Sequence, residues 1–289
     1  MTVFEPSREQ VLEYCARDPI ERVFLEDVAR RGLGRFSAVA DPAGSLTCLC
    51  HAGANVVPSG AGAAAFAPVA AEAHARMIIG ELGAVSELWQ EARGLLPPAR
   101  EDRPHQPVYA ITEPPPAGET GLRPATRADV DRLVPACAAA HELELHLNPL
   151  ARDPEAFRWR TEAQIDDGRS WLWVEGGVIL FKAEASAWTP SAVQLQQVWV
   201  DPEARGRGHG ARGLRDLVRL LLNSSFEHFE PLVLAVFKQI GLGQRFGAAG
   251  EFAGDRMLFA ALTDTVLHRL DLHFLPILAE GAGDATMAV

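Results

Sequence analysis

The chain contains Val198-Trp199-Val200-Asp201-Pro202-Glu203-Ala204-Arg205-Gly206-Arg207-Gly208-His209-Gly210, the stretch that decides its fold. An apolar strand pattern runs into an Asp-Pro break, a loop rich in glycine and arginine follows, and a helix pattern then begins. Glycines let backbone N–H groups turn toward a ligand, and the N-terminal end of a helix carries a partial positive charge. The stretch therefore predicts a phosphate-binding loop between a strand and a helix expected at residues 211–222.

The composition is that of a globular protein with an acidic balance. The chain has 289 residues, 48% of them hydrophobic and 22% charged, and a formal net charge of −11. This length is sufficient for two domains, and no apolar run reaches the roughly 20 residues of a membrane span. Because the first ten residues are polar, we expect a cytoplasmic protein with no membrane partner. The four cysteines are interpreted as buried free thiols, and their spacing predicts no metal site.

A proline cluster marks the strongest boundary in the chain. Pro114, Pro115 and Pro116 follow one another, and Gly118 and Gly121 lie shortly after them. Three successive prolines fit neither a helix nor an internal strand, so the segment is interpreted as a semi-stiff linker. We expect a first domain at 1–113, the linker at 114–121, a second domain at 122–262 and an extension at 263–289. The apolar pattern of the extension is interpreted as an amphipathic helix that covers the core or pairs two subunits in a homodimer.

The same order of elements is expected on both sides of the linker. Before it, we expect helices at 7–16, 20–31, 63–75 and 85–94, and strands at 36–40, 45–51, 54–58, 77–80 and 106–111. After it, we expect helices at 129–147, 157–166, 211–222 and 239–247, and strands at 171–175, 178–184, 193–200, 232–237 and 252–262. In helix 129–147, Ala136, Ala139, Ala140, Leu143 and Leu147 are expected on one side. The parallel between the halves predicts two copies of one α/β fold.

Two ligand classes for the glycine loop are weakened by its surroundings. Residues 208–213 match the G-x-G-x-x-G dinucleotide fingerprint, but seven residues separate its first glycine from the strand and a hairpin precedes it. Five arginines form a possible nucleic-acid patch: Arg205, Arg207, Arg212, Arg215 and Arg219. No aromatic platform is interleaved with these arginines and the chain is acidic, so no nucleic-acid partner is expected.

The loop resembles motif A of the GNAT N-acetyltransferase superfamily, through Arg205, Gly208 and Gly210. The opening Leu122-Arg123-Pro124-Ala125-Thr126, followed by Asp129, resembles the start of GNAT domains. Residues 50–58 and 103–107 resemble the extra N-terminal domain of a bacterial GNAT subgroup. The resemblance implies a mixed α/β fold in which helices flank a central sheet. It also implies two tandem GNAT-like domains, the first of them degenerate.

The same resemblance implies acetyl-CoA as co-substrate and no metal. Loop amides would bind the pyrophosphate of acetyl-CoA, and the strand before them would pair with its pantetheine arm. The implied cofactor residues are Val198, Trp199, Val200, Arg205, Gly206, Arg207, Gly208, His209, Gly210 and Ala211. For His209, the backbone N–H rather than the ring is expected to matter.

The catalytic residues follow less directly from the resemblance. Many GNAT enzymes protonate the leaving thiolate with a tyrosine after the fifth strand, and aligning Gly247 with the family's glycine places Gly243 at that position. Candidate general bases are Glu142 and Glu144, beside His141 and His146, and Glu184 on a hairpin strand. Gln196 and Gln197 lie on opposite faces of their strand, where one of them would orient a water.

The predicted function is acetyl-CoA-dependent N-acetyltransfer to a primary amine by direct attack in a ternary complex. The acceptor is expected to be a small molecule or a peptide. The missing tyrosine favours one alternative, a non-catalytic module that binds acetyl-CoA or another ligand. A second alternative is an acyltransferase that uses a longer acyl-CoA.

Overall fold

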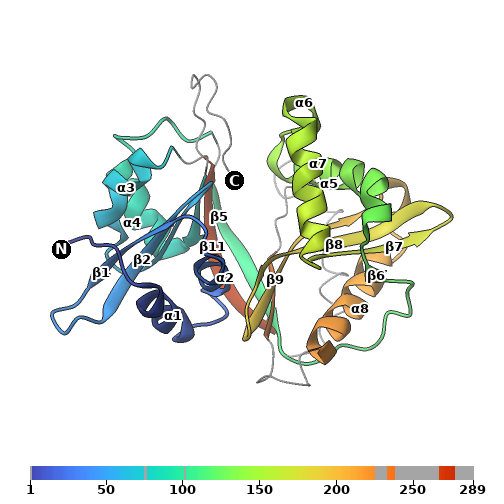
Figure 1. The fold of residues 1–289 in the computed structure, drawn as a ribbon, viewed down its shortest axis with the longest axis horizontal. Helices are drawn as coiled ribbons and strands as arrows, with labels where there is room; N and C mark the ends of the chain where they lie inside the picture. The colour runs from blue at the N-terminus through green and yellow to red at the C-terminus, as the bar shows by residue number, and fades with distance from the viewer. Residues whose placement is uncertain (1, 75–76, 101, 225–232, 238–266, 277–289) are drawn as a thin grey trace, which may run out of the picture. The chain divides into compact units, whose positions relative to one another are not determined.

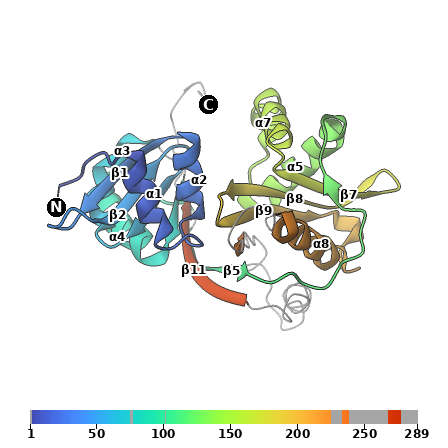
Figure 2. The same cartoon turned by 60° about the horizontal axis from the view of Figure 1, so that its bottom comes forward.

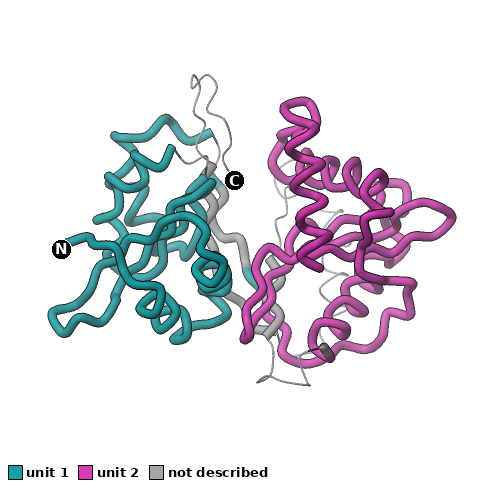
Figure 3. The backbone as a smooth tube through the Cα atoms, in the orientation of Figure 1, with its two compact units in different colours: residues 1–108, 270–289 teal, residues 109–269 magenta. Residues whose placement is uncertain are grey.

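A computed structural model describes residues 2–74, 77–100, 102–224, 233–237 and 267–276. The chain divides into two compact units (Figure 3). The first comprises Met1–Val108 with Leu270–Val289, and the second comprises Tyr109–Arg269. Each unit has its own group of strands and its own helices, so each is described separately.

The first unit is a sheet with helices on both faces (Figure 1). Its helices are α1 (Arg8–Ala16), α2 (Val23–Arg31), the 3-10 helix η1 (Ala63–Phe66), α3 (Ala67–Glu72) and α4 (Leu82–Ala92). Its strands are β1 (Arg35–Ala40), β2 (Leu46–Ala52), β3 (Val56–Gly60) and β4 (Met77–Glu81), with part of β11 (Leu267–Pro276). β1, β2 and β3 pair antiparallel, β3 pairs parallel with β4, and β11 pairs antiparallel with β4.

Local sequence explains how this unit begins and where its core lies. The Ser7 hydroxyl accepts from the Gln10 N–H, and the Gln10 side chain accepts from the Ser7 N–H, so a capping box starts α1. Side chains of α1 and α2 pack with one face of β2 and β3, and those of η1, α3 and α4 pack with the other face. Cys48 and Cys50 point to the same buried face, and all four cysteines are free and buried, as expected.

The second unit repeats this arrangement with a longer sheet. Strand β5 (Arg103–Ile111) leads into it, and its other strands are β6 (Arg123–Pro124), β7 (Ser170–Glu175), β8 (Val178–Trp188), β9 (Ala192–Val200) and β10 (Val233–Phe237). Its helices are α5 (Val130–Leu145), α6 (Pro149–Arg152), α7 (Pro154–Asp166) and α8 (His209–Ser224), with short 3-10 turns η2 (Arg127–Asp129) and η3 (Pro202–Ala204). The strand order is β5-β10-β9-β8-β7-β6. β6 to β9 pair antiparallel, and β9 pairs parallel with β10.

Two cores lie on opposite faces of this sheet. Figure 2 shows α5 and α7 on one face and α8 on the other. α8 packs closely because it has a glycine at the contact: a Cβ on Gly213 would lie 2.5 Å from the Phe181 ring. This close approach brings the start of α8, and the glycine loop before it, against the end of β9.

Both units therefore share one order of elements: α-helices, three antiparallel strands, a helix and then a strand parallel to the third. This confirms the predicted mixed α/β fold with sheets flanked by helices. The amphipathic helix expected in the extension 263–289 is wrong, because β11 occupies Leu267–Pro276. Leu270, Leu272 and Phe274 alternate with Asp271 and His273, which is the two-residue period of a strand. The elements expected at 239–247 and 252–262 lie outside the described residues.

The segment expected to be a semi-stiff linker is bonded along α8. The Asp216 carboxylate accepts from the backbone N–H groups of Gly118 and Thr120, at 2.6 and 2.8 Å, and from the Thr120 hydroxyl. Arg212 donates to the carbonyls of Gly118 and Glu119 at 2.8 and 2.7 Å. We call residues 115–120 the α8 strap. Its polar backbone is satisfied by one face of α8, which holds it in place.

Candidate functional site

The glycine loop joins the end of β9 to the start of α8. Gly206 and Gly208 have φ values of 74° and 79°, a left-handed conformation that glycine adopts without strain. The backbone N–H groups of residues 206–208 have no acceptor among the described residues. The first helical turn closes when the Arg212 N–H donates to the Gly208 carbonyl, which leaves the amides before Arg212 without helical acceptors. The loop thus presents a run of N–H donors at the positive end of a 16-residue helix.

Aromatic packing under the loop fixes its position. The rings of His209 and Trp173 meet edge to face, with centroids 5.0 Å apart. The Arg212 guanidinium lies 5.0 Å from the centre of the same Trp173 ring. The Arg205 side chain turns back and donates to the Val200 carbonyl at 3.2 Å. His209 and Arg205 therefore support the loop with their side chains, which leaves its backbone to face a ligand.

Strand β9 has two recorded neighbours, β8 and β10, before the loop. It pairs with β10 from Ala192 to Leu195. Its pairing with β8 continues to Val200 but shifts register between Gln196 and Trp199. Gln197 lies in this shift with a φ of 50°, so β9 has a bulge there. The segment Val198–Val200 thus keeps one edge on β8, and its other edge lies beyond the recorded pairing with β10.

In the first unit, glutamate carboxylates accept hydrogen bonds from the N–H groups of the equivalent loop. That loop follows β3, which pairs antiparallel with the strand before it and parallel with β4. Glu87 accepts from the N–H groups of Gly62 and Ala63 at 2.8 and 3.0 Å, and Glu81 accepts from the Gly60 N–H at 3.1 Å. The N–H donors that would meet an anion here are bonded to glutamate side chains. Only the second unit leaves the corresponding loop amides without a described acceptor.

The three candidate bases lie in different environments. Glu142 is exposed near the end of α5, and its carboxylate accepts from the Asn148 side chain at 3.3 Å. Glu144 is buried on the same helix. Glu184 is buried on β8, on the face covered by α5. The structure therefore does not gather the three carboxylates into one constellation.

Glu184 belongs to a buried polar cluster that the sequence analysis missed. Lys182 donates to Glu184 at 2.8 Å, to the Cys137 sulfur at 3.0 Å and to the Gln197 side-chain oxygen at 3.2 Å. The Cys137 thiol also donates to Glu184 at 3.0 Å. We call Cys137, Lys182, Glu184 and Gln197 the β8–β9 cluster. Each of the four side chains is less than 5% exposed.

Charge pairing sets the ionisation of this cluster. Burial opposes the ionised form of Glu184, but Lys182 and Arg160 outweigh burial and lower the pKa of Glu184 to about 2. Burial alone would lower the pKa of Lys182, but Cys137 and Glu184 outweigh it, so that pKa is raised. Burial raises the pKa of Cys137 to about 12, so it remains a thiol at neutral pH. A carboxylate this acidic is a counter-ion for Lys182 and a weak proton acceptor.

The rim of the cluster contains His141 and Arg160. The His141 Nε2 lies 3.3 Å from Arg160 Nη1, and Arg160 Nη2 lies 3.8 Å from Glu184. Burial, reinforced by the charge of Arg160, lowers the pKa of His141 to about 4. His141 is therefore neutral at physiological pH.

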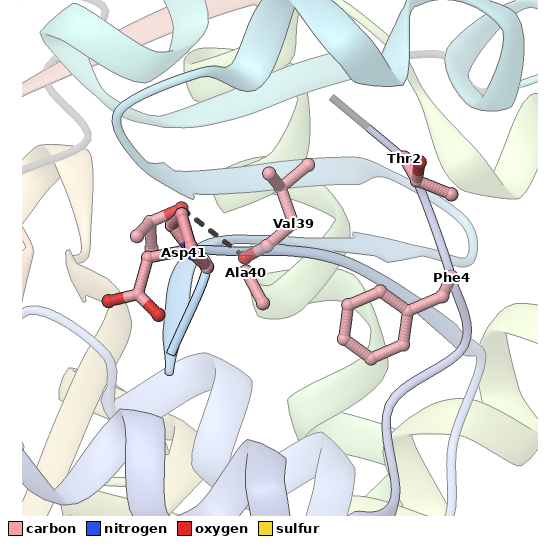
Figure 4. A pocket seen from close by; sticks show the side chains of 7 residues that line it. Thr2, Phe4, Val39, Ala40 and Asp41 are labelled. Carbon is pink, nitrogen blue, oxygen red and sulfur yellow. Dashed lines mark hydrogen bonds between the residues drawn. The ribbon is translucent and has the colours of Figure 1, made fainter. Parts of the chain in front are cut away.

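A separate hollow of about 600 Å³ lies on the first unit (Figure 4). Thr2 and Phe4 lie on one side of it and Asp41 on the other. The Asp41 carboxylate already accepts from the N–H groups of Ala43 and Ser45 in its turn, so it is not free for chemistry. Within the described residues, no group of three or more His, Cys, Asp or Glu side chains is placed to hold a metal ion. Nor does any helix in that part of the chain have the length and apolarity needed to cross a membrane.

Comparison with family models assigns the second unit. Residues 138–243 match the acetyltransferase (GNAT) family. The matched residues include β9, the glycine loop and α8. The chain carries a GNAT acetyltransferase domain. Residues 34–133 match a second model, described as a domain of unknown function, DUF4081. No curated protein matches the chain.

Solved structures resemble the chain over nearly its whole length. A GCN5-related N-acetyltransferase from Sphaerobacter thermophilus is 18% identical, with 94% of each chain covered and a TM-score of 0.54. A GNAT-family acetyltransferase from Colwellia psychrerythraea is 8% identical, with 96% and 100% coverage and a TM-score of 0.52. A tandem GNAT protein of clavulanic acid biosynthesis is 11% identical, with 96% and 99% coverage and a TM-score of 0.51. At these identities the likeness establishes the fold only.

The structure brings the sequence-derived cofactor residues together and leaves the catalytic residues apart. Val198–Val200 and the loop form one continuous edge at the GNAT domain's β9–α8 junction. The missed cluster had one signal in the sequence. Lys182 and Glu184 are two residues apart in an otherwise apolar strand, so they share a face and indicate a buried ion pair. The position expected for the family's tyrosine, Gly243, lies outside the described residues.

Proposed function

We propose that the GNAT domain is an acetyl-CoA-dependent N-acetyltransferase that transfers an acetyl group to a primary amine by direct attack in a ternary complex. The observation that carries this proposal is the loop at residues 206–208, whose amides have no acceptor among the described residues. The corresponding amides of the first unit are bonded to Glu81 and Glu87. The contrast supports one acyl-CoA site per chain, with the first unit as a degenerate GNAT-like partner.

The cofactor would extend along the β9–α8 junction. Its pyrophosphate would accept from the amides of residues 206–211, where the helix end adds positive potential. Its pantetheine arm would run beside Val198–Val200 and pair with the strand edge that lies beyond the recorded pairing with β10. Trp199 is 8% exposed and packs in the core on the α5 side, so only its backbone would meet the cofactor.

The reaction needs a neutral amine and a stabilised oxyanion. The amine nitrogen would attack the thioester carbonyl, the C–S bond would then break, and CoA thiolate would leave. Glu184 is paired with Lys182 and is a weak base, so we assign it no proton transfer. Glu142 is exposed and remains our candidate to accept the amine proton, directly or through water, and Glu144 is the alternative.

Thiol release measured beside binding tests the proposal. The full chain is incubated with acetyl-CoA and a panel of primary amines, free thiol is followed optically, and acetyl-CoA binding is measured by calorimetry. Binding with amine-dependent thiol release is the expected result. Binding with no release across a broad panel would instead favour a non-catalytic acetyl-CoA module, and faster release from a longer acyl-CoA would favour that donor. Failure to bind any acyl-CoA refutes the proposal.

A pair of glycine substitutions tests the loop itself. Gly208→Asp places a side chain and a negative charge where the pyrophosphate would bind, so we expect acetyl-CoA affinity to fall at least about tenfold. Gly177→Asp is the matched control, because Gly177 has a similar φ of 83° and equally open surroundings but lies in the β7–β8 hairpin. Backbone strain is then common to both variants. Equal affinities for the two would contradict the loop assignment.

A further inference from the structure

Strand β9 has an unusual backbone at Gln197. Its φ of 50° is in the left-handed region, which is disfavoured for a residue with a Cβ atom. Trp199 pairs with Lys182 and Gln196 pairs with Glu184, so two residues of β9 oppose Ala183 alone. A bulge of this kind usually has glycine at its left-handed position. Something in the structure must hold a glutamine there.

Lys182 supplies that restraint. Its ammonium group has three N–H donors, and three acceptors surround it: Glu184, Cys137 and the Gln197 side chain. Lys182 is 0% exposed and Gln197 is 4% exposed, so neither group exchanges its partner for water. Glu184 neutralises the charge and so keeps the ammonium group in place. The β8–β9 cluster thus ties the side chain of the bulge residue to the neighbouring strand.

The bulge lies just after the last recorded pairing of β9 with β10. Pairing between these strands is recorded up to Leu195, two residues before Gln197. Val198–Val200, directly after the bulge, is the segment along which the pantetheine arm would run. A bulge bends its strand and increases the local twist. The conformation of Gln197 therefore sets the direction of the Val198–Val200 edge, along which the pantetheine arm and its thioester would lie.

We propose that Lys182 is a positioning residue for acyl transfer, which holds Gln197 in the left-handed conformation and so aims the Val198–Val200 edge at the thioester. This inference rests on the proposed function of the GNAT domain. A purely structural ion pair would be replaced by apolar side chains with no selective effect on transfer. If Lys182 has a positioning role, acyl transfer requires a positive φ at residue 197. The charges of Lys182 and Glu184 are then dispensable when residue 197 can adopt that φ by itself.

The test first removes the Lys182–Glu184 ion pair that holds the Gln197 side chain. It then restores the left-handed conformation of residue 197 without that ion pair. Lys182→Met combined with Glu184→Gln removes both charges, so no unpaired charge stays buried. We expect kcat to fall at least about tenfold, because small misplacements of reacting groups cost that much or more. The dissociation constant for acetyl-CoA, which the glycine loop would dominate, should change less than about threefold. Adding Gln197→Gly should recover most of kcat, because glycine adopts a positive φ without restraint.

Two comparisons keep this result interpretable. Thr161→Val removes a different buried hydrogen bond, from the Thr161 hydroxyl to the Phe157 carbonyl, and should leave kcat and KM unchanged. Equal losses of kcat and of acetyl-CoA affinity in the double variant, or no recovery with Gln197→Gly, would overturn the positioning role.

A spectroscopic measurement separates this inference from the proposed function. Gln196–Gln197 is the only Gln-Gln pair in the sequence, so carbonyl-¹³C and amide-¹⁵N glutamine labelling selects the Gln197 amide in an NMR spectrum. Added Cα labelling then reports its backbone conformation. We expect a left-handed residue in the wild type and an extended one in the double variant. An unchanged Gln197 overturns the positioning role of Lys182 whether or not the protein transfers acetyl groups, whereas a wild type without thiol release refutes the proposed function alone.

Discussion

Substitution of Gly213 by alanine tests the packing that seats α8. A Cβ at this position would lie 2.5, 2.6 and 2.8 Å from three atoms of the Phe181 ring. Ordinary contacts are about 3.5–4.0 Å, so the ring would have to move by roughly 1 Å. Phe181 is 0% exposed, so its ring is enclosed by other buried side chains. Overpacking of this kind costs about 1–3 kcal/mol, and the better helix propensity of alanine returns at most about 1 kcal/mol. Because three ring atoms are approached this closely, we take the upper part of that range, about 2–3 kcal/mol, which leaves a net loss of about 1–2 kcal/mol.

Urea unfolding followed by tryptophan fluorescence measures this loss. Five of the six tryptophans fall within the second unit, so the signal reports mainly on it: Trp159, Trp171, Trp173, Trp188 and Trp199. A loss of this size should lower the urea midpoint by about 0.5–1 M. Gly83→Ala in α4 is the control, since nothing lies within 4 Å of its added Cβ, and it should be neutral or stabilising. A Gly213→Ala protein as stable as the wild type would refute the packing argument.

Two further predictions concern titration and the α8 strap. The lowered pKa of His141, about 4, means that the unfolded chain binds its proton first, so His141 makes the unfolding free energy fall as pH drops from about 6.5 to 4. His141→Gln should flatten the wild-type pH dependence in that window by up to about 1.4 kcal/mol per pH unit, measured by urea unfolding, and an unchanged slope would contradict it. Asp216→Asn should weaken the bonds to Gly118 and Thr120 by about 1–3 kcal/mol. Faster hydrogen exchange at those two amides is the readout, and equal exchange rates would contradict the strap's dependence on the Asp216 charge.

Much of the fold is predictable because its signals are local. The Ser7–Gln10 capping box and the Asp41 turn each involve a few neighbouring residues. Most expected helices and strands therefore agree with the structure to within a few residues. The helix predicted in the extension 263–289 was wrong for a related reason. Its leucines fit both a helical and a two-residue period, and pairing with β4 decides the outcome, which sequence periodicity does not contain.

Long-range placement limits what the sequence shows of the site. The glycine loop was predictable because its glycines, the strand before it and the helix after it are contiguous. The β8–β9 cluster was not, since Cys137 and Lys182 are 45 residues apart and meet only after α5 packs on the sheet. The expected face of that helix was also partly wrong, because Ala139 and Leu147 are exposed. Polar Glu144 is buried on this helix instead, and a pattern based on apolar residues alone omits it.

The two units have the same topology but differ in the hydrogen bonding of the loop amides. In both, a strand that ends beside a parallel neighbour leads through glycines with positive φ into a helix. In the first unit, the carboxylates of Glu81 and Glu87 accept from the loop amides, so an anionic ligand would have to displace a built-in anion. In the second unit the loop side chains turn inward, Arg205 to Val200 and His209 to Trp173, and the amides keep their hydrogen-bonding capacity. Whether the loop amides of these two units are available to a ligand therefore depends less on the glycines than on whether a nearby carboxylate reaches the loop.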